Sequence, residues 1–182
     1  MKKLLIASLM VAGLAMTALA QTPAYPTQQG TYLQTADGYH HLELNQSSGM
    51  KTHGALKAMA TYGVHGVDAD WIYKGAHAST QITQHKPAFL LVSTADTSID
   101  SVQLVRFDVK KDSREIRASH ANAYGGVETG SKDKDSITLT VTRTSEGYLL
   151  ITSKEDLQPG EYLLMDAVVP SGGYNGYTFG VQ

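Results

Sequence analysis

From residue 31 onward, apolar and polar residues alternate with a period of two, and turn-forming residues interrupt the alternation every eight to twelve positions. Successive side chains of a β-strand point to opposite faces of a sheet, so this pattern predicts strands. The expected strands are Tyr32–Thr35, Tyr39–Leu44, Val67–Tyr73, Ala78–Thr83, Ala88–Ser93, Val102–Val109, Glu115–Ala121, Ile137–Thr142, Tyr148–Thr152, Tyr162–Val169 and Tyr177–Val181. The segment Ala55–Tyr62 is compatible with a short helix or with an irregular strand.

Two β-hairpins follow from the turn residues between these strands. Asp37-Gly38 supplies the positive φ that a tight hairpin requires, and the polar run Lys110–Arg114 is a second solvated turn. Before that second turn, Val105, Phe107 and Val109 are expected to share one buried face. Gly125-Gly126 and the run Thr129–Asp135 are expected to form a long polar loop.

The segment Leu157-x-Pro159-Gly160-x-Tyr162 stands between two predicted strands. It is similar to the tyrosine corner of Greek-key sandwiches, in which a tyrosine hydroxyl bonds to backbone a few residues upstream. Leu157 is then expected to close the end of the core. The alternative is an ordinary proline-glycine turn with an exposed tyrosine.

The fold class that this pattern predicts is all-β. About seven strands from residue 88 onward favour an immunoglobulin-like Greek-key sandwich over residues 86–182. A smaller N-terminal β region, residues 31–85, is expected to precede it. The chain has no cysteine, and a core without disulfides is feasible at this length.

The first twenty residues have the pattern of a secretory signal peptide. Lys2 and Lys3 precede the apolar stretch 4–15, and Ala18-Leu19-Ala20 ends the segment with a small-x-small cleavage signal. Residues 21–30 are expected to be an unstructured spacer. No later segment is apolar for long enough to suggest a transmembrane helix. We therefore expect an exported protein, periplasmic or extracellular, with no transmembrane segment after cleavage.

The charge pattern argues against nucleic acid as a partner. The formal net charge is −2 for the whole chain, and removal of Lys2 and Lys3 with residues 1–20 takes it to −4. The chain contains no basic run that would bind phosphate groups or an anionic membrane. A protein or another component of the cell envelope is the expected partner.

Five segments together carry a resemblance to known proteins. They are Leu56-Lys57-x-Met59-Ala60-Thr61, Lys111–Glu115, Lys132-Asp133-Lys134, Leu157-x-Pro159-Gly160-Glu161-Tyr162 and Tyr177-x-Phe179-Gly180-Val181. Over about residues 50–182 the chain resembles uncharacterised exported bacterial β-sandwich proteins with a Leu-x-Pro-Gly-Glu-Tyr corner and a Phe-Gly-Val ending. The resemblance implies a fold and a compartment, and it supplies no catalytic residue.

Histidines are distributed unevenly along the chain. His40, His41, His53, His65, His77 and His85 all lie between residues 40 and 85, and His120 stands apart. Imidazole nitrogens suit zinc or copper, and Met50-x-x-His53 adds a thioether that suits copper. However, adjacent side chains on a strand point to opposite faces, and no spacing fixes three ligands. We therefore assign no metal ligands and favour separate histidines.

Asp68-x-Asp70 places two carboxylates on one face of a strand, with Trp71 on the other. Paired carboxylates can transfer protons or bind calcium, but no second catalytic element accompanies them. A solvated edge strand is the interpretation that we favour. The run Lys132–Asp135 is a poor calcium loop, because its lysines repel the ion.

The remaining motifs give no reaction and no cofactor. Gly-x-Ser-x-Gly and phosphate-binding glycine loops are missing, and Gly172-Gly173 is interpreted as a loop hinge. Asn45-Gln46-Ser47, preceded by Glu43, matches a glycosylation sequon that we expect to stay unmodified. The tyrosine-containing loop 171–177 is the best candidate for recognition, although a flexible hairpin connection is the favoured interpretation.

The resulting hypothesis is an exported, non-enzymatic protein that uses a β-sandwich as an interaction or structural module. The alternative is an exported zinc- or copper-binding protein that uses histidines of its N-terminal half. A hydrolase with a site assembled only in space is a third hypothesis.

Overall fold

The computed structural model describes residues 24–93, 97–166 and 175–182, so the predicted signal peptide lies outside it. These residues form sixteen strands, one α-helix and two short 3-10 helices. The prediction of an all-β protein is confirmed. The strands are β1 (Gly30–Thr35), β2 (Gly38–His41), β3 (Leu44–Gln46), β4 (Gly49–His53), β5 (Val67–Lys74), β6 (Gln81–Ile82), β7 (Ala88–Val92), β8 (Val102–Arg106), β9 (Asp108–Val109), β10 (Ser113–Asn122), β11 (Gly126–Thr129), β12 (Ser136–Ile137), β13 (Leu139–Arg143), β14 (Leu149–Ser153), β15 (Gly160–Asp166) and β16 (Asn175–Val181). The helices are α1 (Ala55–Ala60), η1 (Ile99–Ser101) and η2 (Asp133–Asp135).

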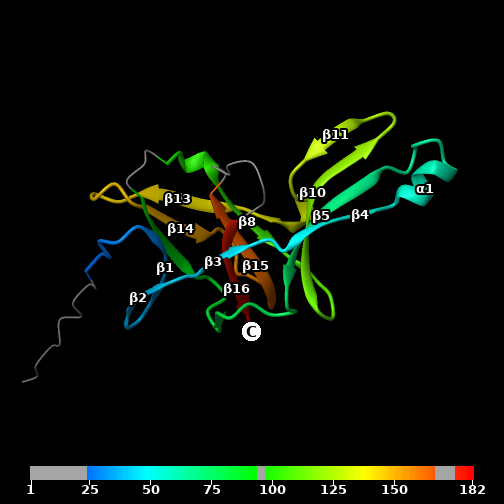
Figure 1. The fold of residues 1–182 in the computed structure, drawn as a ribbon. Helices are drawn as coiled ribbons and strands as arrows, with labels where there is room; N and C mark the ends of the chain where they lie inside the picture. The colour runs from blue at the N-terminus through cyan, green and yellow to red at the C-terminus, as the bar shows by residue number, and fades with distance from the viewer. Residues whose placement is uncertain (1–23, 94–96, 167–174) are drawn as a thin grey trace, which may run out of the picture.

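The strands form three sheets (Figure 1). Sheet A has the order β13-β14-β7-β1-β2, and sheet B has the order β12-β8-β15-β16-β3, with β6 added in parallel to β16. Sheet C has the order β11-β10-β5-β4, with β9 paired to β10. All pairings other than that of β6 are antiparallel among the described residues.

Sheet B is the central layer, because its two faces contribute to two different cores. On one face, Tyr162 and Leu164 of β15 pack with Phe89 of sheet A. On the other face, Leu163 and Met165 pack with residues of sheet C. The uninterrupted apolar run 162–165 within β15 is typical of a strand that is buried on both sides.

Every sheet contains strands from before and from after residue 86, the domain boundary predicted from the sequence. In sheet A, β1 pairs with β7, and in sheet B, β3 pairs with β16. In sheet C, β5 pairs with β10 over most of its length. Tyr25, in the predicted spacer, lies against Tyr39 and Tyr148, with ring centroids 5.8 and 6.0 Å apart.

Two segments predicted as single strands are divided between sheets. The segment 102–109 forms β8 in sheet B and β9 in sheet C, and it changes sheet at Phe107. Val105 and Phe107 are buried, whereas Val109 is exposed, so the expected common face was wrong at Val109. The segment 137–142 similarly changes from sheet B to sheet A at Thr138. Alternation alone does not show such a bend, because the period of two continues through it.

Both hairpins are confirmed by the strand register. Thr35 pairs with Gly38 across the first turn, and Lys110 N donates to Ser113 O across the second. The undecided segment 55–62 begins with α1 and continues as a turn. Part of the predicted polar loop is instead β11, which pairs with the end of β10.

The tyrosine corner has the geometry that the sequence predicts. The Tyr162 hydroxyl donates to Gln158 O at 2.6 Å, four residues upstream, and Leu157 is buried in the core. The alternative of an exposed tyrosine is wrong, because Tyr162 is 1% exposed. Burial raises the pKa of Tyr162, so its hydroxyl keeps the proton that it donates. Tyr32 makes an equivalent bond to Gln28 O at 3.0 Å.

Sheet C extends away from the other two sheets, with α1 and the β10–β11 turn at its far end (Figure 1). A buried ion pair joins its base to sheet B. Arg114 Nη1 of β10 lies 3.6 Å from Glu161 Oε2 of β15, and each side chain is 5% exposed. Removing such charges from water costs several kcal/mol unless close partners compensate.

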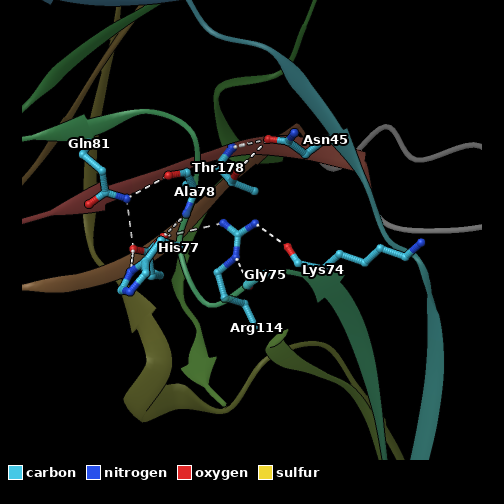
Figure 2. Close-up of polar contacts among 9 residues, drawn as sticks. Asn45, Lys74, Gly75, His77, Ala78, Gln81, Arg114 and Thr178 are labelled. Carbon is cyan, nitrogen blue, oxygen red and sulfur yellow. Dashed lines mark hydrogen bonds and ion pairs between the residues drawn. The ribbon is translucent and has the colours of Figure 1, made fainter. Parts of the chain in front are cut away.

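Arg114 has partners besides Glu161 (Figure 2). Its Nε and Nη2 atoms donate to Gly75 O at 3.2 Å and to Lys74 O at 3.3 Å. The guanidinium carbon also lies 5.2 Å from the centroid of the Phe107 ring, a cation–π distance. Burial lowers the pKa of Arg114, and the Glu161 carboxylate opposes this effect. The guanidinium stays protonated, since arginine titrates far above neutral pH.

The Glu161 carboxylate accepts hydrogen bonds from the loop that precedes β6 and from the first residue of β6. Ala78 N donates at 2.7 Å, Gln81 Nε2 at 3.1 Å and His77 Nδ1 at 3.1 Å. Beside this cluster, Thr178 Oγ1 donates to Asn45 Oδ1 at 2.6 Å and holds β3 on β16 (Figure 2). The contact between sheets B and C around Arg114 and Glu161, which we call the junction, is therefore a polar network inside a layer that is otherwise apolar.

No helix within the described residues has the length and the apolar composition needed to cross a lipid bilayer.

We expect Tyr162→Phe to lower the free energy of unfolding by about 1 kcal/mol, because it removes one buried hydrogen bond and leaves Gln158 O without its donor. Urea unfolding measures the change. Tyr62→Phe is the matched control, since Tyr62 is 94% exposed. Equal effects of the two substitutions would contradict a role for the hydroxyl.

We expect Arg114→Met to lower the free energy of unfolding by about 3–5 kcal/mol, because it leaves the Glu161 charge buried without its cation. Lys110→Met breaks the exposed pair with Asp108 and is expected to cost less than about 1 kcal/mol. Urea unfolding of the two variants side by side checks the difference. A cost for Arg114→Met as small as that for Lys110→Met would show that the buried pair is dispensable.

Candidate functional site

The histidines of the N-terminal half do not gather around one point. His40 and His41 are neighbours on β2, with His40 Nε2 3.2 Å from Asp37 and His41 packed on the Tyr32 ring. His77 contacts Glu161 at the junction, and His85 Nδ1 donates to Leu157 O at 2.9 Å. Among the described residues, the one group of three possible metal ligands contains a single histidine, so neither zinc nor copper finds three imidazoles together.

The face of sheet C that points away from sheet B carries a row of ionisable side chains. Residues paired across antiparallel strands have their side chains on the same face. Asp70 of β5 pairs with Lys51 of β4 and with Arg117 of β10, and Asp68 pairs with His53 and with His120. Trp71 and Tyr73 occupy the opposite face and pack toward sheet B.

The prediction that Asp68 and Asp70 share a face is confirmed, but the expectation of an edge strand was wrong. Strand β5 lies between β4 and β10 in the interior of sheet C. The sequence gives no signal for this position, because the short polar strand β4 covers the edge. Both carboxylates therefore have neighbours on two sides instead of facing only solvent.

One cluster on this face combines an imidazole with two carboxylates. His53 Nε2 donates to Asp70 Oδ2 at 2.6 Å. His53, Asp70 and Glu115 each offer one ligand atom, and these three atoms lie within 4.8 Å of one another. The Glu115 side chain is 6% exposed, and Lys51 Nζ is 3.5 Å from its Oε1 atom. Within the described part of the chain, this is the one group of three such residues.

A second pair on the same face, His120 and Asp68, is joined by a hydrogen bond. His120 Nδ1 lies 2.8 Å from Asp68 Oδ1, and Asn122 Nδ2 lies 3.3 Å from His120 Nε2. An amide nitrogen only donates, so Nε2 accepts and Nδ1 carries the proton that Asp68 accepts. Both nitrogens of His120 are thus used within the protein.

A polar cavity of about 410 Å³ lies beside the cluster. Asp70, Glu115 and Arg117 line it together with Asp108 and Lys134. The Arg117 guanidinium donates to the carbonyl oxygens of residues 130 and 131 at 3.1 Å, which ties it to the loop that follows β11. The cavity gives solvent and small ions access to the two carboxylates.

The far end of sheet C carries a group of exposed apolar side chains, which we call the apolar tip. Its members are Leu56, Met59, Tyr62, Val64, Tyr124 and Val127. They come from α1, the turn that follows it, the β10–β11 turn and β11. Ala123 N donates to Gly63 O at 3.1 Å, which joins the two turns.

Other candidates from the sequence have structural roles or lie elsewhere. Met50 is opposite Trp71 and His53 is opposite Asp68, so the proposed thioether and imidazole lie on opposite faces of β4. Asn45 of the sequon uses its side-chain oxygen to bind Thr178.

Of two loops predicted from the sequence, one borders the cavity and the other lies partly outside the described residues. The run 132–135 contains η2, and Lys132, Lys134 and Asp135 line the cavity. Residues 171–174 of the tyrosine loop lie outside the described part, and residues 175–177 begin β16.

Sequence reasoning missed Glu115 and the apolar tip. Glu115 follows a polar turn and has no partner nearby in the sequence, so only the pairing of β10 with β5 brings it to His53 and Asp70. For the apolar tip, the run Ala55–Tyr62 does show apolar residues without a strand period, which is a weak signal.

Comparison with known proteins gives no relative: no protein-family model matches the chain, and no curated protein matches it significantly.

Proposed function

We propose that this is an exported, non-enzymatic interaction module, in which an immunoglobulin-like Greek-key sandwich carries sheet C as an arm whose apolar tip binds a protein of the cell envelope. The signal sequence supports export to the periplasm or the exterior. The facing sheets A and B, with a tyrosine corner at Tyr162, support the sandwich assignment. The apolar tip carries the proposal for binding.

Single exposed apolar residues are common on protein surfaces, but a contiguous group marks a site of association. Six of the eleven exposed large apolar residues among those described belong to the apolar tip. Tyr62 is 94% exposed, and Leu56 and Tyr124 are each 84% exposed. Folding places these side chains at one end of sheet C and leaves them exposed, which supports a role in binding a partner.

The composition of the apolar tip favours a protein over a lipid surface. Tyrosine and methionine are enriched at the centres of protein interfaces. Attachment to an anionic membrane depends on clustered lysine and arginine, whereas α1 carries the single base Lys57 and the chain is acidic overall. The proposed partner therefore presents an apolar pocket or groove that is complementary to the tip.

Photo-crosslinking in living cells tests this proposal. Benzoylphenylalanine replaces Tyr62 in the apolar tip, and in a second strain it replaces Leu44, which is exposed on β3 of sheet B. We expect a discrete crosslinked envelope protein from position 62 and none from position 44, because only the tip is buried in the complex. Immunoblotting detects the adduct, and mass spectrometry identifies it.

The outcome of the crosslinking experiment separates three explanations. An adduct with one envelope protein, lost when Leu56 and Met59 are both replaced by serine, supports the proposal. An adduct only with lipid, or only with a second copy of this chain, contradicts the proposed partner. Equal labelling from positions 62 and 44 contradicts the assignment of the tip as the binding surface.

A further inference from the structure

We infer that His53, Asp70 and Glu115 form a binding site for one divalent transition-metal ion, zinc being the ion that best suits these ligands. This site is independent of the apolar tip and of the proposed partner. Zinc binds imidazole nitrogen and carboxylate oxygen, and three protein ligands with an open position are a common arrangement. The three ligand atoms already lie within 4.8 Å of one another. A tetrahedral zinc site places its ligands about 3.3 Å apart, so small side-chain rotations complete it.

Glu115 is the observation that distinguishes this cluster from a surface group of acids. Its side chain is 6% exposed, and among the described residues its one hydrogen bond is the 3.5 Å contact with Lys51 Nζ. An ionised carboxylate offers about four acceptor positions, and a buried one is costly unless these are used. A cation between Glu115 and Asp70 adds to the contacts with Lys51 and with the solvent of the cavity.

The balance of charge also favours a divalent ion. Neutral His53 with ionised Asp70 and Glu115 carries a formal charge of −2, and Lys51 offsets one unit of it. Arg117, although paired with Asp70 in register, is held by the backbone of residues 130 and 131 and lies 3.7 Å from Glu128. A divalent ion neutralises both carboxylates and releases Lys51, which is half exposed, to solvent.

The 410 Å³ cavity provides the remaining features of a metal site. It reaches Asp70 and Glu115, so an ion has a path to the ligands and room for a water molecule in the open position. The donor atoms are nitrogen and oxygen, which excludes the soft copper site suggested by Met50, because that thioether lies on the opposite face of β4. When Nε2 binds the ion, the proton that it now donates in the hydrogen bond to Asp70 leaves to solvent and Nδ1 takes one up, so the imidazole stays neutral.

Isothermal titration calorimetry with zinc chloride tests the site, using the exported protein purified without a histidine tag and freed of metal. We expect one zinc ion per chain. We expect His53→Gln and Glu115→Gln each to weaken binding at least tenfold, since loss even of an outer-shell partner of a metal ligand costs about 10–100-fold. Lys51→Met is expected to tighten binding, because it removes the competing cation.

His120→Gln is the matched control, since His120 pairs with Asp68 on the same face but has both nitrogens occupied and no third ligand. Its affinity for zinc should equal that of the unchanged protein. Absence of zinc binding would overturn the inference, as would weakening by His120→Gln equal to that by His53→Gln. Titration of the unchanged protein followed by NMR of the histidine rings requires no variant to fold. Zinc must shift the His53 resonances before those of His120, and the reverse order would also overturn the inference.

Discussion

The buried pair of Arg114 and Glu161 is the interaction on which the arrangement of the three sheets depends. Both side chains lie inside an apolar layer, where neither charge is tolerable alone. The surrounding loop supplies donors to the carboxylate, and two carbonyl oxygens accept from the guanidinium. These bonds require β10, β15 and residues 74–81 to be in one relative position. The network therefore fixes where sheet C leaves the sandwich.

This constraint gives a physical role to two segments that stand out in the sequence. The segment Lys111–Glu115 contributes Arg114 to the ion pair, and the corner motif contributes Glu161 to the pair and Tyr162 to the tyrosine corner. The adjacent Glu115 points to the other face of β10 and joins His53 and Asp70. One short segment thus serves both the attachment of sheet C and the inferred metal site.

Much of the fold was predictable because it depends on local signals. Period-two alternation located the long strands, Asp37-Gly38 located the first hairpin, and the spacing of Pro159, Gly160 and Tyr162 identified the corner. The changes of sheet at Phe107 and Thr138 were not predictable, since the alternation is continuous there. The inferred site depends on a cross-strand register between distant segments, and the histidine pattern gave no sign that His53 meets Asp70 and Glu115.

Hydrogen–deuterium exchange of the Arg114→Met variant, followed by mass spectrometry, tests most directly whether the ion pair holds sheet C on the sandwich. Exchange reports local opening, so each sheet can be followed separately. We expect exchange to accelerate more in β4, β5 and β10 than in β1, β7 and β14 of sheet A, because sheet C then also opens on its own. Equal acceleration in all three sheets, or unchanged protection of sheet C, would contradict the account.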